Sequence, residues 1–503
     1  MQNIFDLLSN LPDLIGFYQL VAIVLGLLIG MIVGVLPGIG PLLGVVMAIP
    51  FTFYMQPVSA MALLIGIYQG GAYGGAIAST MIGIPGTPMA AATLLDARPM
   101  ALNGKASVAV TLSTLGSSFG GVLSAIILIA TASQLAAIAL KFGPAETAAF
   151  AFLGLTTLGA LSGGTAIKGW MMGALGLFFA VIGRDPISGV ARYTFDTVYL
   201  EGGITLVPLL VGMFSISEIL MQIENPARAH DVDGDVSASS EAFRSLIMRP
   251  VNYVRSSLIG VFVGILPGVG GVTASYMSYR VAMLFRKKQD PDFGQGNSDG
   301  VIACETANSA VTGGALIPML ALSIPGDPIV AVLMGGLMLQ GVQPGAMMFI
   351  QHGDVVSGIF LSFLVTALLL LPLGLLFIRG AVQLLHVPQW AVMTGVLLLS
   401  LVGTYSISQQ IHDLTALLVF GAIGYLLRKR GFPLAPVVIG FVLGPIFETN
   451  FRRMSLISQG DIVGYIADRP ITLAALGLAL VFLIFPLISM ILRKSNGGPA
   501  AND

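Results

Sequence analysis

Long apolar stretches without a single charged side chain dominate the chain. There is no Asp, Glu, Lys or Arg between Asp13 and Asp96, and further uncharged stretches cover residues 106–140, 147–167, 256–279, 328–353, 355–378 and 470–492. A transmembrane helix needs about 20 apolar residues, whereas a transmembrane strand needs about ten of alternating character. The stretches are long and apolar on all sides, so they predict an all-α polytopic membrane protein with about 12 transmembrane helices plus re-entrant or broken ones.

Only two segments of the chain are rich in polar and charged residues. They cover residues 224–249 and 286–299, and the first lies near the middle of the chain. We therefore expect a first unit over residues 1–222, a polar linker over 223–250 and a second unit over 251–503.

Two glycine–proline motifs occur twice, in the same order. Residues 30–41 (GMIVGVLPGIGP) align with residues 260–271 (GVFVGILPGVGG), with seven of the twelve positions identical. Residues 84–88 (IPGTP) then align with residues 324–328 (IPGDP). Two separate motifs in one order predict that the second unit repeats the first.

The distribution of basic residues indicates how the two repeats are oriented. The basic run that begins at Arg286 corresponds to residues 56–58, and Arg98 and Lys105 correspond to residues 338–343, both of which are uncharged. Loops rich in Lys and Arg stay in the cytoplasm, so parallel repeats would carry positive charge at matching loops. The mismatch predicts two inverted structural repeats.

Composition narrows the class of protein further. Charged residues make up 9% of the chain and its mean hydropathy is +0.92, whereas a soluble protein carries about 25% charged residues. A water-soluble enzyme is therefore excluded, and the net charge of −1 provides no basic surface for nucleic acid. A lone cysteine, Cys304, and four histidines without ligand spacing predict no enzyme, no cofactor and no metal other than a Na⁺ coupling ion.

The 63 glycines and 27 prolines must lie largely within the membrane part. Non-helical backbone survives there only where protein or a watery cavity covers it. We expect helices broken near 37–41, 84–88, 267–271 and 324–328, with ordinary helix packing and kinks as the alternative. Because the N-termini of half-helices attract anions, the predicted substrate-binding residues are Gly38, Gly40, Pro41, Gly86, Thr87, Pro88, Gly268, Gly270, Gly271, Thr273, Asn308, Ser309, Gly326 and Pro328.

Acidic side chains near the second pair of breaks are candidates for binding a coupling ion. Ionisable residues within spans are rare and usually functional, so Asp327 and Glu305 are predicted to hold Na⁺ or a proton, and Thr312 is a further candidate for binding the coupling ion. Two alternatives stay open: Asp327 as a helix N-cap and Glu305 as a surface-facing acid beside the polar segment. Other acids, including Glu146 and Glu218, are interpreted as helix ends or interfacial side chains.

The same motifs carry a resemblance to a known family. They are GVLPGIGP at 34–41, YGGA at 73–76, IPGTP at 84–88, LD at 95–96, PMA at 99–101, FGPAE at 142–146, DP at 185–186, GV at 189–190, ETANSA at 305–310, IPG at 324–326 and PLAP at 433–436. Over nearly its whole length the chain resembles the large membrane subunit of the tripartite tricarboxylate transporters (TctA type). It departs from the family pattern at Ser309, where Asn is common, and at Asp327, where a small neutral residue is common.

The resemblance implies a multi-pass carrier of the bacterial inner membrane that imports di- or tricarboxylates. A Na⁺ or H⁺ gradient would drive alternating access, with vertical movement of the broken-helix domain as one form of it. The implied partners are a small four-helix membrane subunit and a periplasmic solute-binding protein, within a lipid bilayer, and a homo-oligomer stays open. On the residues alone, a stand-alone carboxylate carrier and a passive organic-anion channel remain alternatives.

Overall fold

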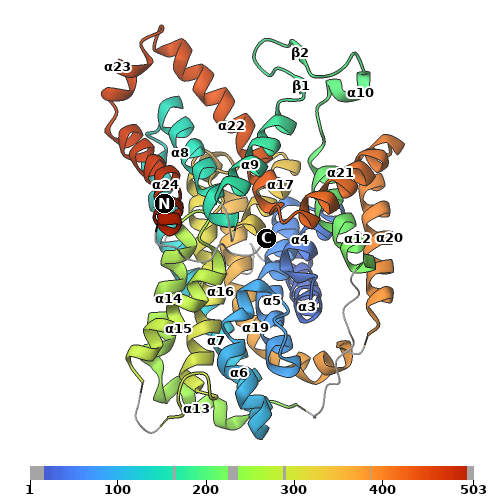
Figure 1. Cartoon of the computed structure of the whole chain (residues 1–503), viewed down its shortest axis with the longest axis vertical. Helices are drawn as coiled ribbons and strands as arrows, with labels where there is room; N and C mark the ends of the chain where they lie inside the picture. Colours follow the sequence, from blue (N-terminus) through green and yellow to red (C-terminus); the bar gives the residue numbers. More distant parts are fainter. Residues whose placement is uncertain (1–15, 163–165, 225–235, 287–289, 386, 496–503) are drawn as a thin grey trace.

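The computed structural model describes residues 16–162, 166–224, 236–286, 290–385 and 387–495 (Figure 1). The elements of the first unit are α3 (Phe17–Val35), α4 (Gly40–Thr52), α5 (Pro57–Ile82), η1 (Pro88–Ala91), α6 (Leu94–Met100), η2 (Ala101–Lys105), α7 (Ala106–Ala139), α8 (Pro144–Thr156), η3 (Thr157–Ser162), α9 (Ala166–Ala180), β1 (Gly183–Arg184), β2 (Ala191–Arg192), α10 (Val198–Glu201), α11 (Leu206–Val211), η4 (Gly212–Ile216) and α12 (Ser217–Glu224). The remaining elements are α13 (Ser240–Met248), α14 (Pro250–Ile265), α15 (Gly270–Leu284), α16 (Ser298–Leu322), α17 (Pro328–Leu339), α18 (Met348–Gln351), α19 (Gly353–Leu384), α20 (Gln389–Ser408), α21 (Ile411–Lys429), α22 (Ala435–Ile457), α23 (Ile462–Ala467) and α24 (Pro470–Ser495).

Several helices are long and apolar enough to cross a membrane, which confirms an all-α polytopic protein. Within the described ranges there are seven candidates: Phe17–Val35, Pro57–Ile82, Leu94–Ala139, Leu206–Glu224, Gly353–Ala381, Trp390–Ile407 and Ile411–Lys429. The expected count of about 12 is not confirmed. Other apolar helices, such as α4 with 13 residues and α17 with 12, are each too short to span alone.

The polar linker expected over 223–250 is not simply a loop. Residues 225–235 lie outside the described part, but α13 follows them and packs against α7. Ala242 and Ser245 are buried, whereas most of the other side chains of α13 stay partly or fully exposed. An amphipathic helix of this kind carries too many polar residues to be distinguished from a linker by composition.

In the first unit, α3 and α5 approach each other closely through glycine. Glycines spaced four residues apart occur on both helices, at 26, 30 and 34 of α3 and at 66, 70 and 74 of α5. A methyl group added at Gly30 would lie 2.5 Å from the carbonyl oxygen of Ile67, and one at Gly34 would lie 2.4 Å from that of Gly71. The backbones are therefore in direct contact, as small residues permit between membrane helices.

The second unit repeats this arrangement with α14 and α16. A methyl group added at Gly260 would lie 2.4 Å from the carbonyl oxygen of Ala307, and one at Gly264 would lie 2.6 Å from that of Val311. Gly260 and Gly264 align with Gly30 and Gly34 of the first unit. The repeated sequence motif thus corresponds to a repeated helix contact.

The two units also pack into each other. Helices α5 and α16 form the centre, because residues 59–81 and 299–321 are buried without interruption. The later segments of each unit then lie against the other unit: α7 packs on α16, α19 on α5, α17 on α4 and α5, and η1 on α15.

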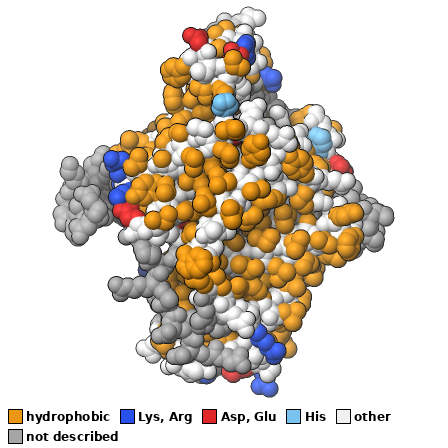
Figure 2. All heavy atoms as spheres, turned by 90° about the vertical axis from the view of Figure 1, so that its right-hand side faces the viewer, with side chains coloured by type: hydrophobic (Ala, Val, Ile, Leu, Met, Phe, Trp, Pro, Cys, Tyr) orange, Lys and Arg blue, Asp and Glu red, His pale blue; other side chains and the backbone are white. Residues whose placement is uncertain are grey.

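The short hairpin of β1 and β2 projects from one end of the molecule, whereas α6 and α13 lie at the opposite end (Figure 1). Ion pairs connect the hairpin to α22: Arg452 contacts Asp185 at 2.6 Å and Arg192 contacts Glu448 at 2.5 Å. The N–H of Ser188 and the guanidinium of Arg452 hold the pKa of Asp185 well below its usual range. Figure 2 shows hydrophobic side chains across the middle of one face, with charged side chains mainly toward its ends and one edge.

Two acids that were expected to be helix ends or interfacial side chains make ion pairs. Glu146 does lie in the first turn of α8, and its carboxylate also contacts Arg469 at 2.9 Å. Glu218 lies in the first turn of α12 and pairs with Arg428 of α21. Both acids therefore connect segments that are far apart in the sequence.

Candidate functional site

Each copy of the Leu-Pro-Gly motif separates two helices. In the second unit, α14 ends at Ile265 and α15 begins at Gly270, after Gly268 with φ of +80°. The corresponding Gly38 has φ of +89° and separates α3 from α4. Glycine adopts this left-handed conformation without the steric penalty that other residues meet. The backbone N–H groups at the start of α15 are therefore not used by a preceding turn of the same helix.

Each copy of the Ile-Pro-Gly motif packs beneath the first helix of its own unit. A methyl group added at Gly86 would lie 2.2 Å from the carbonyl oxygen of Gly34, and one at Gly326 would lie 2.5 Å from that of Gly264. The N–H of Gly268 donates to the carbonyl oxygen of Gly326 at 3.0 Å. The two broken segments of the second unit are thus directly bonded to each other.

Asp327 caps α17 and also contacts the first unit. Its carboxylate accepts a hydrogen bond from the N–H of Val330 at 2.8 Å and another from the hydroxyl of Tyr68 on α5. Thr87, at the equivalent position, accepts a bond from the N–H of Ala90 at 3.3 Å and precedes Pro88 of η1. The N-cap interpretation of Asp327 therefore describes its contacts, and the side chain is also buried, at 1% exposed.

Glu305 lies in the interior of the molecule, which excludes the surface-facing alternative. The side chain is fully buried on α16 and accepts hydrogen bonds from the hydroxyl of Thr93 and from that of Ser117, the latter at 3.3 Å. No ion pair within the described ranges involves Glu305. A carboxylate in apolar surroundings is costly unless a cation or a proton compensates its charge.

Asn308 lies one turn beyond Glu305, next to the start of α15. Its Nδ2 donates to the carbonyl oxygen of Ala72 at 3.2 Å, whereas its Oδ1 has no hydrogen-bond partner in the described part of the chain. A methyl group added at Gly271 would lie 3.3 Å from this Oδ1 and 3.0 Å from Sδ of Met89. Because buried polar atoms are normally paired, the open Oδ1 indicates a place where a ligand or ordered water belongs.

Two further buried hydroxyls on the same helix have no partner among the described residues. They belong to Thr306, whose hydroxyl faces Gly116 of α7, and to Ser309, which follows Asn308. The hydroxyl of Thr312 is engaged, because it donates to the carbonyl oxygen of Ser309 at 2.6 Å. A short stretch of α16 therefore offers a buried carboxylate, an open amide oxygen and two open hydroxyls.

The other predicted site residues do not all converge on this stretch. Thr273 is exposed on α15 and donates to its own helix, to the carbonyl oxygen of Val269 at 3.0 Å. Gly38 lies beside Gln222, whose Nε2 would be 2.9 Å from a methyl group at that glycine. Gly40 and Pro41 begin α4, where Pro41 packs on Gly71.

Sequence reasoning missed Thr93, Ser117 and Tyr68, which contact the two buried acids. Thr93 and Tyr68 belong to the first unit, far in sequence from Glu305 and Asp327. The only available signal was a hydroxyl in an apolar stretch, and many such hydroxyls bond to their own helix, as that of Thr114 does to the carbonyl oxygen of Val110.

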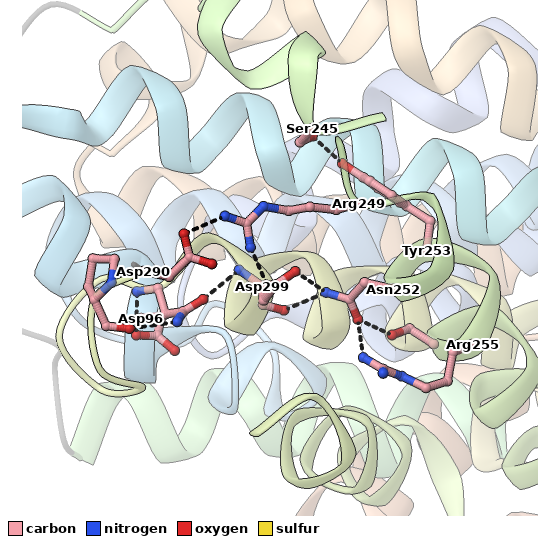
Figure 3. Close-up of polar contacts among 11 residues, drawn as sticks. Asp96, Ser245, Arg249, Asn252, Tyr253, Arg255, Asp290 and Asp299 are labelled. Carbon is pink, nitrogen blue, oxygen red and sulfur yellow. Dashed lines mark hydrogen bonds and ion pairs between the residues drawn. The ribbon is translucent and has the colours of Figure 1, made fainter. Parts of the chain in front are cut away.

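A second polar network joins the units at one end of the helices (Figure 3). The carboxylate of Asp96 on α6 accepts from the N–H groups of Gly294, Gly296 and Asn297, at 2.8, 3.0 and 2.8 Å. Arg249 pairs with Asp290 at 2.8 Å and with Asp299. This network holds residues 290–299 of the polar segment 286–299 in place, and residues 287–289 of that segment lie outside the described ranges.

Comparison with known proteins gives one family and two relatives. Residues 20–439 match the model of the family described as "Tripartite tricarboxylate transporter TctA family". A protein of Agrobacterium vitis described as "Uncharacterized 52.8 kDa protein in TAR-I ttuC' 3'region" is 35% identical over 460 residues, which cover 90% of each chain. A second, "Uncharacterized protein in TAR-II ttuC' 3'region" from the same organism, is 37% identical over 237 residues, or 47% of this chain and 97% of its own. No solved structure matches.

Proposed function

The chain belongs to the tripartite tricarboxylate transporter TctA family, and on this premise we propose that it imports di- or tricarboxylates as the large transmembrane subunit of a binding-protein-dependent secondary transporter. The family is one of transporters, which agrees with the expectation that the chain is not an enzyme. The partners of such transporters are of the expected kinds, a small membrane subunit and a solute-binding protein. The proposed location is the bacterial inner membrane.

The observation that carries the proposal is the buried carboxylate of Glu305 without a basic partner in the described ranges. A cation or a proton that enters with the substrate would neutralise it, and oxygen atoms are the ligands that hard cations prefer. Asn308 Oδ1, one turn along the same helix, supplies a further open oxygen. We propose Glu305 as the main coupling-ion ligand, with Asp327 and Thr312 as further candidates.

The substrate carboxylates would bind at the start of α15. The free N–H groups and the positive end of the helix dipole attract anions there, and the open hydroxyl of Ser309 supplies a further donor. Gly270 and Gly271 let a ligand approach the backbone closely. Gly38, Gly86 and Gly326 stay candidates at the remaining helix breaks.

The transport cycle would be alternating access between two inverted repeats. The repeated order of helix, break and helix in α3–α4–α5 and α14–α15–α16 supports the repeat itself, and the proposed inversion rests on the distribution of basic residues along the sequence. The proposed number of crossings is about 12, counted with shorter apolar helices such as Ala166–Ala180 and Pro470–Ile484 beside the seven long ones. Movement of the broken-helix segments across the membrane is the proposed form of the cycle.

The proposal is tested by uptake into proteoliposomes that contain this chain, the small membrane subunit and the solute-binding protein. A panel of di- and tricarboxylates is offered with and without a Na⁺ gradient, and with and without a pH gradient. We expect concentrative uptake with the wild-type chain, and Glu305→Gln should lose most of the stimulation by the coupling ion. Asp327→Asn is the matched acid-to-amide change, and unchanged Na⁺ and pH dependence in that variant would remove Asp327 from the coupling role.

Two results would contradict the proposal. Flux that only follows the electrochemical gradient of the substrate would indicate a passive anion channel. Full concentrative uptake without the solute-binding protein would indicate a carrier that works alone.

A further inference from the structure

A groove on the outer side of α14 and α15 has no occupant assigned to it by the transport proposal. It is a shallow groove of about 590 Å³ that is widely open on its outer side. Apolar residues of α14 from Pro250 to Phe262 line it, together with Met277 of α15. Leu258 and Phe262 are 52% and 59% exposed, so this face of α14 points away from the protein core.

One charged side chain, Arg255, is among the described residues that line this apolar groove. Its Nη2 donates to Oδ1 of Asn252 at 2.8 Å, and its guanidinium lies 4.6 Å from the ring centre of Phe285. Its Nε is buried and has no partner in the described part of the chain. Two arrangements of arginine can be compared in Figure 3: Arg249 is neutralised by Asp290 and Asp299, whereas Arg255 contacts only the neutral Asn252 among the residues drawn.

The position of Arg255 suits the headgroup of a lipid. It lies in the second turn of α14, directly after the polar segment that ends at Arg249, so it is near the end of the helix. Arg280 of α15 is exposed and lies three residues beyond Met277, which places it on the same face of the helix. A guanidinium without a carboxylate partner binds phosphate through paired hydrogen bonds.

We propose that this groove binds an anionic phospholipid. An acyl chain would lie along Val254, Leu258 and Phe262, and the phosphate would accept hydrogen bonds from the free N–H groups of Arg255. The net negative charge of the lipid would compensate the guanidinium, which a zwitterionic lipid compensates less well because it also carries an ammonium. Through Asn252, Arg255 is bonded to the network of Asp299 and Arg249, so the lipid would rest against the joint between the two units.

The test is native mass spectrometry of the purified full chain in detergent, with phosphatidylglycerol or phosphatidylethanolamine added at equal concentration. We expect the wild-type chain to retain phosphatidylglycerol in preference to phosphatidylethanolamine. Arg255→Gln should weaken retention of phosphatidylglycerol about tenfold, the effect of losing one charge-assisted interaction. Leu258→Trp, which fills the groove but keeps the arginine, should weaken retention of both lipids.

The matched control is Arg379→Gln, which removes an exposed arginine from α19, outside the groove, and should leave retention unchanged. Thermal unfolding in the same detergent shows whether each variant is folded. If Arg255→Gln does not fold, the loss of lipid retention in Leu258→Trp tests the proposal instead. Equal retention of the two lipids by the wild-type chain would overturn the proposal. An equal loss in the Arg379 and Arg255 variants would do so as well, because it would indicate attraction of anionic lipid by any exposed arginine.

Discussion

Asp327 makes contacts that stabilise the folded structure, and its counterpart in the first unit is the uncharged Thr87. It caps α17 and accepts from Tyr68, whereas Thr87 only caps η1. We expect Asp327→Ala to lower the free energy of unfolding by about 1–3 kcal/mol, because it removes a cap and leaves the buried Tyr68 hydroxyl unpaired. Asp327→Asn keeps the acceptor and should cost less.

Chemical unfolding of the purified chain in detergent measures both variants. Tyr68→Phe is the matched control, because it removes the hydroxyl without touching the cap. The interpretation fails if Asp327→Ala and Asp327→Asn are equally stable.

The lowered pKa of Asp185 gives the hairpin segment a pH-dependent anchor. The N–H of Ser188 and Arg452 favour the ionised carboxylate, so this group stabilises the fold at pH values above its unfolded pKa of about 3.9. That contribution declines as the pH falls through the lower folded pKa. We expect Asp185→Asn to be less stable than the wild-type chain near about pH 6, with the difference shrinking steadily below about pH 4.

Thermal unfolding at several pH values checks this, with Glu201→Gln as a control. Glu201 pairs with Arg184 on the same segment, but these side chains are 38% and 58% exposed, respectively, so solvent screens the pair and it should contribute little. A difference between Asp185→Asn and the wild-type chain that stayed constant down to pH 3 would contradict the anchor.

The residues of the candidate site could be predicted only in part. The repeat and the rarity of acids in spans were enough to single out Gly271, Asn308 and Glu305. Their partners could not be found, because Thr93 is 212 positions from Glu305 and Ser117 is 188 positions from it. Hydroxyls within spans usually bond to their own helix, so their identity alone did not distinguish these two.

At the scale of elements, the glycine contacts between α3 and α5 should decide how well the pair packs. A methyl group at Gly30 would collide with backbone atoms of α5, which cannot rotate away as a side chain can. We therefore expect Gly30→Ala to destabilise the protein by about 1–3 kcal/mol. Gly260→Ala, its counterpart on α14, should have a similar effect.

Gly380→Ala on α19 is the matched control, because nothing lies within 4 Å of the added methyl group. Alanine favours helix more than glycine, so this variant should lose no stability. The measurement is again unfolding in detergent, and equal stability of the Gly30 and Gly380 variants would argue against close packing.

The elements themselves could be predicted unevenly. Long apolar stretches predicted helices correctly, because a transmembrane helix needs about 20 consecutive apolar residues. The number of transmembrane helices could not be derived from these stretches, because α4 and α17 are apolar but too short to cross a membrane alone. The polar helix α13 was hidden within the expected linker, because its burial depends on α7, a distant segment.

At the scale of the whole molecule, inverted repeats would place equivalent positions on opposite faces of the membrane. Gln56 and Gln295 lie in the corresponding connections before α5 and α16, and both are exposed. We expect cysteines introduced there to react with an impermeant maleimide from opposite sides of the membrane. The native Cys304 is buried and should remain silent as an internal control.

Labelling of both positions from the same side would show parallel repeats instead. Cysteine at Asp292, which is also exposed, provides a second position on the same loop. Agreement between the two neighbouring positions separates true topology from the local accessibility of one side chain.

The exchange of contacts between the units has a consequence for how the protein is made. Tyr68, Thr93 and Asp96 emerge from the ribosome well before the groups of the second unit that they contact. A domain usually folds as a unit soon after synthesis, but here the first unit must wait in the membrane with these polar groups unmatched. These contacts can therefore form only after the second unit has been synthesised as far as Asp327, and until then the polar groups of the first unit lack their native partners.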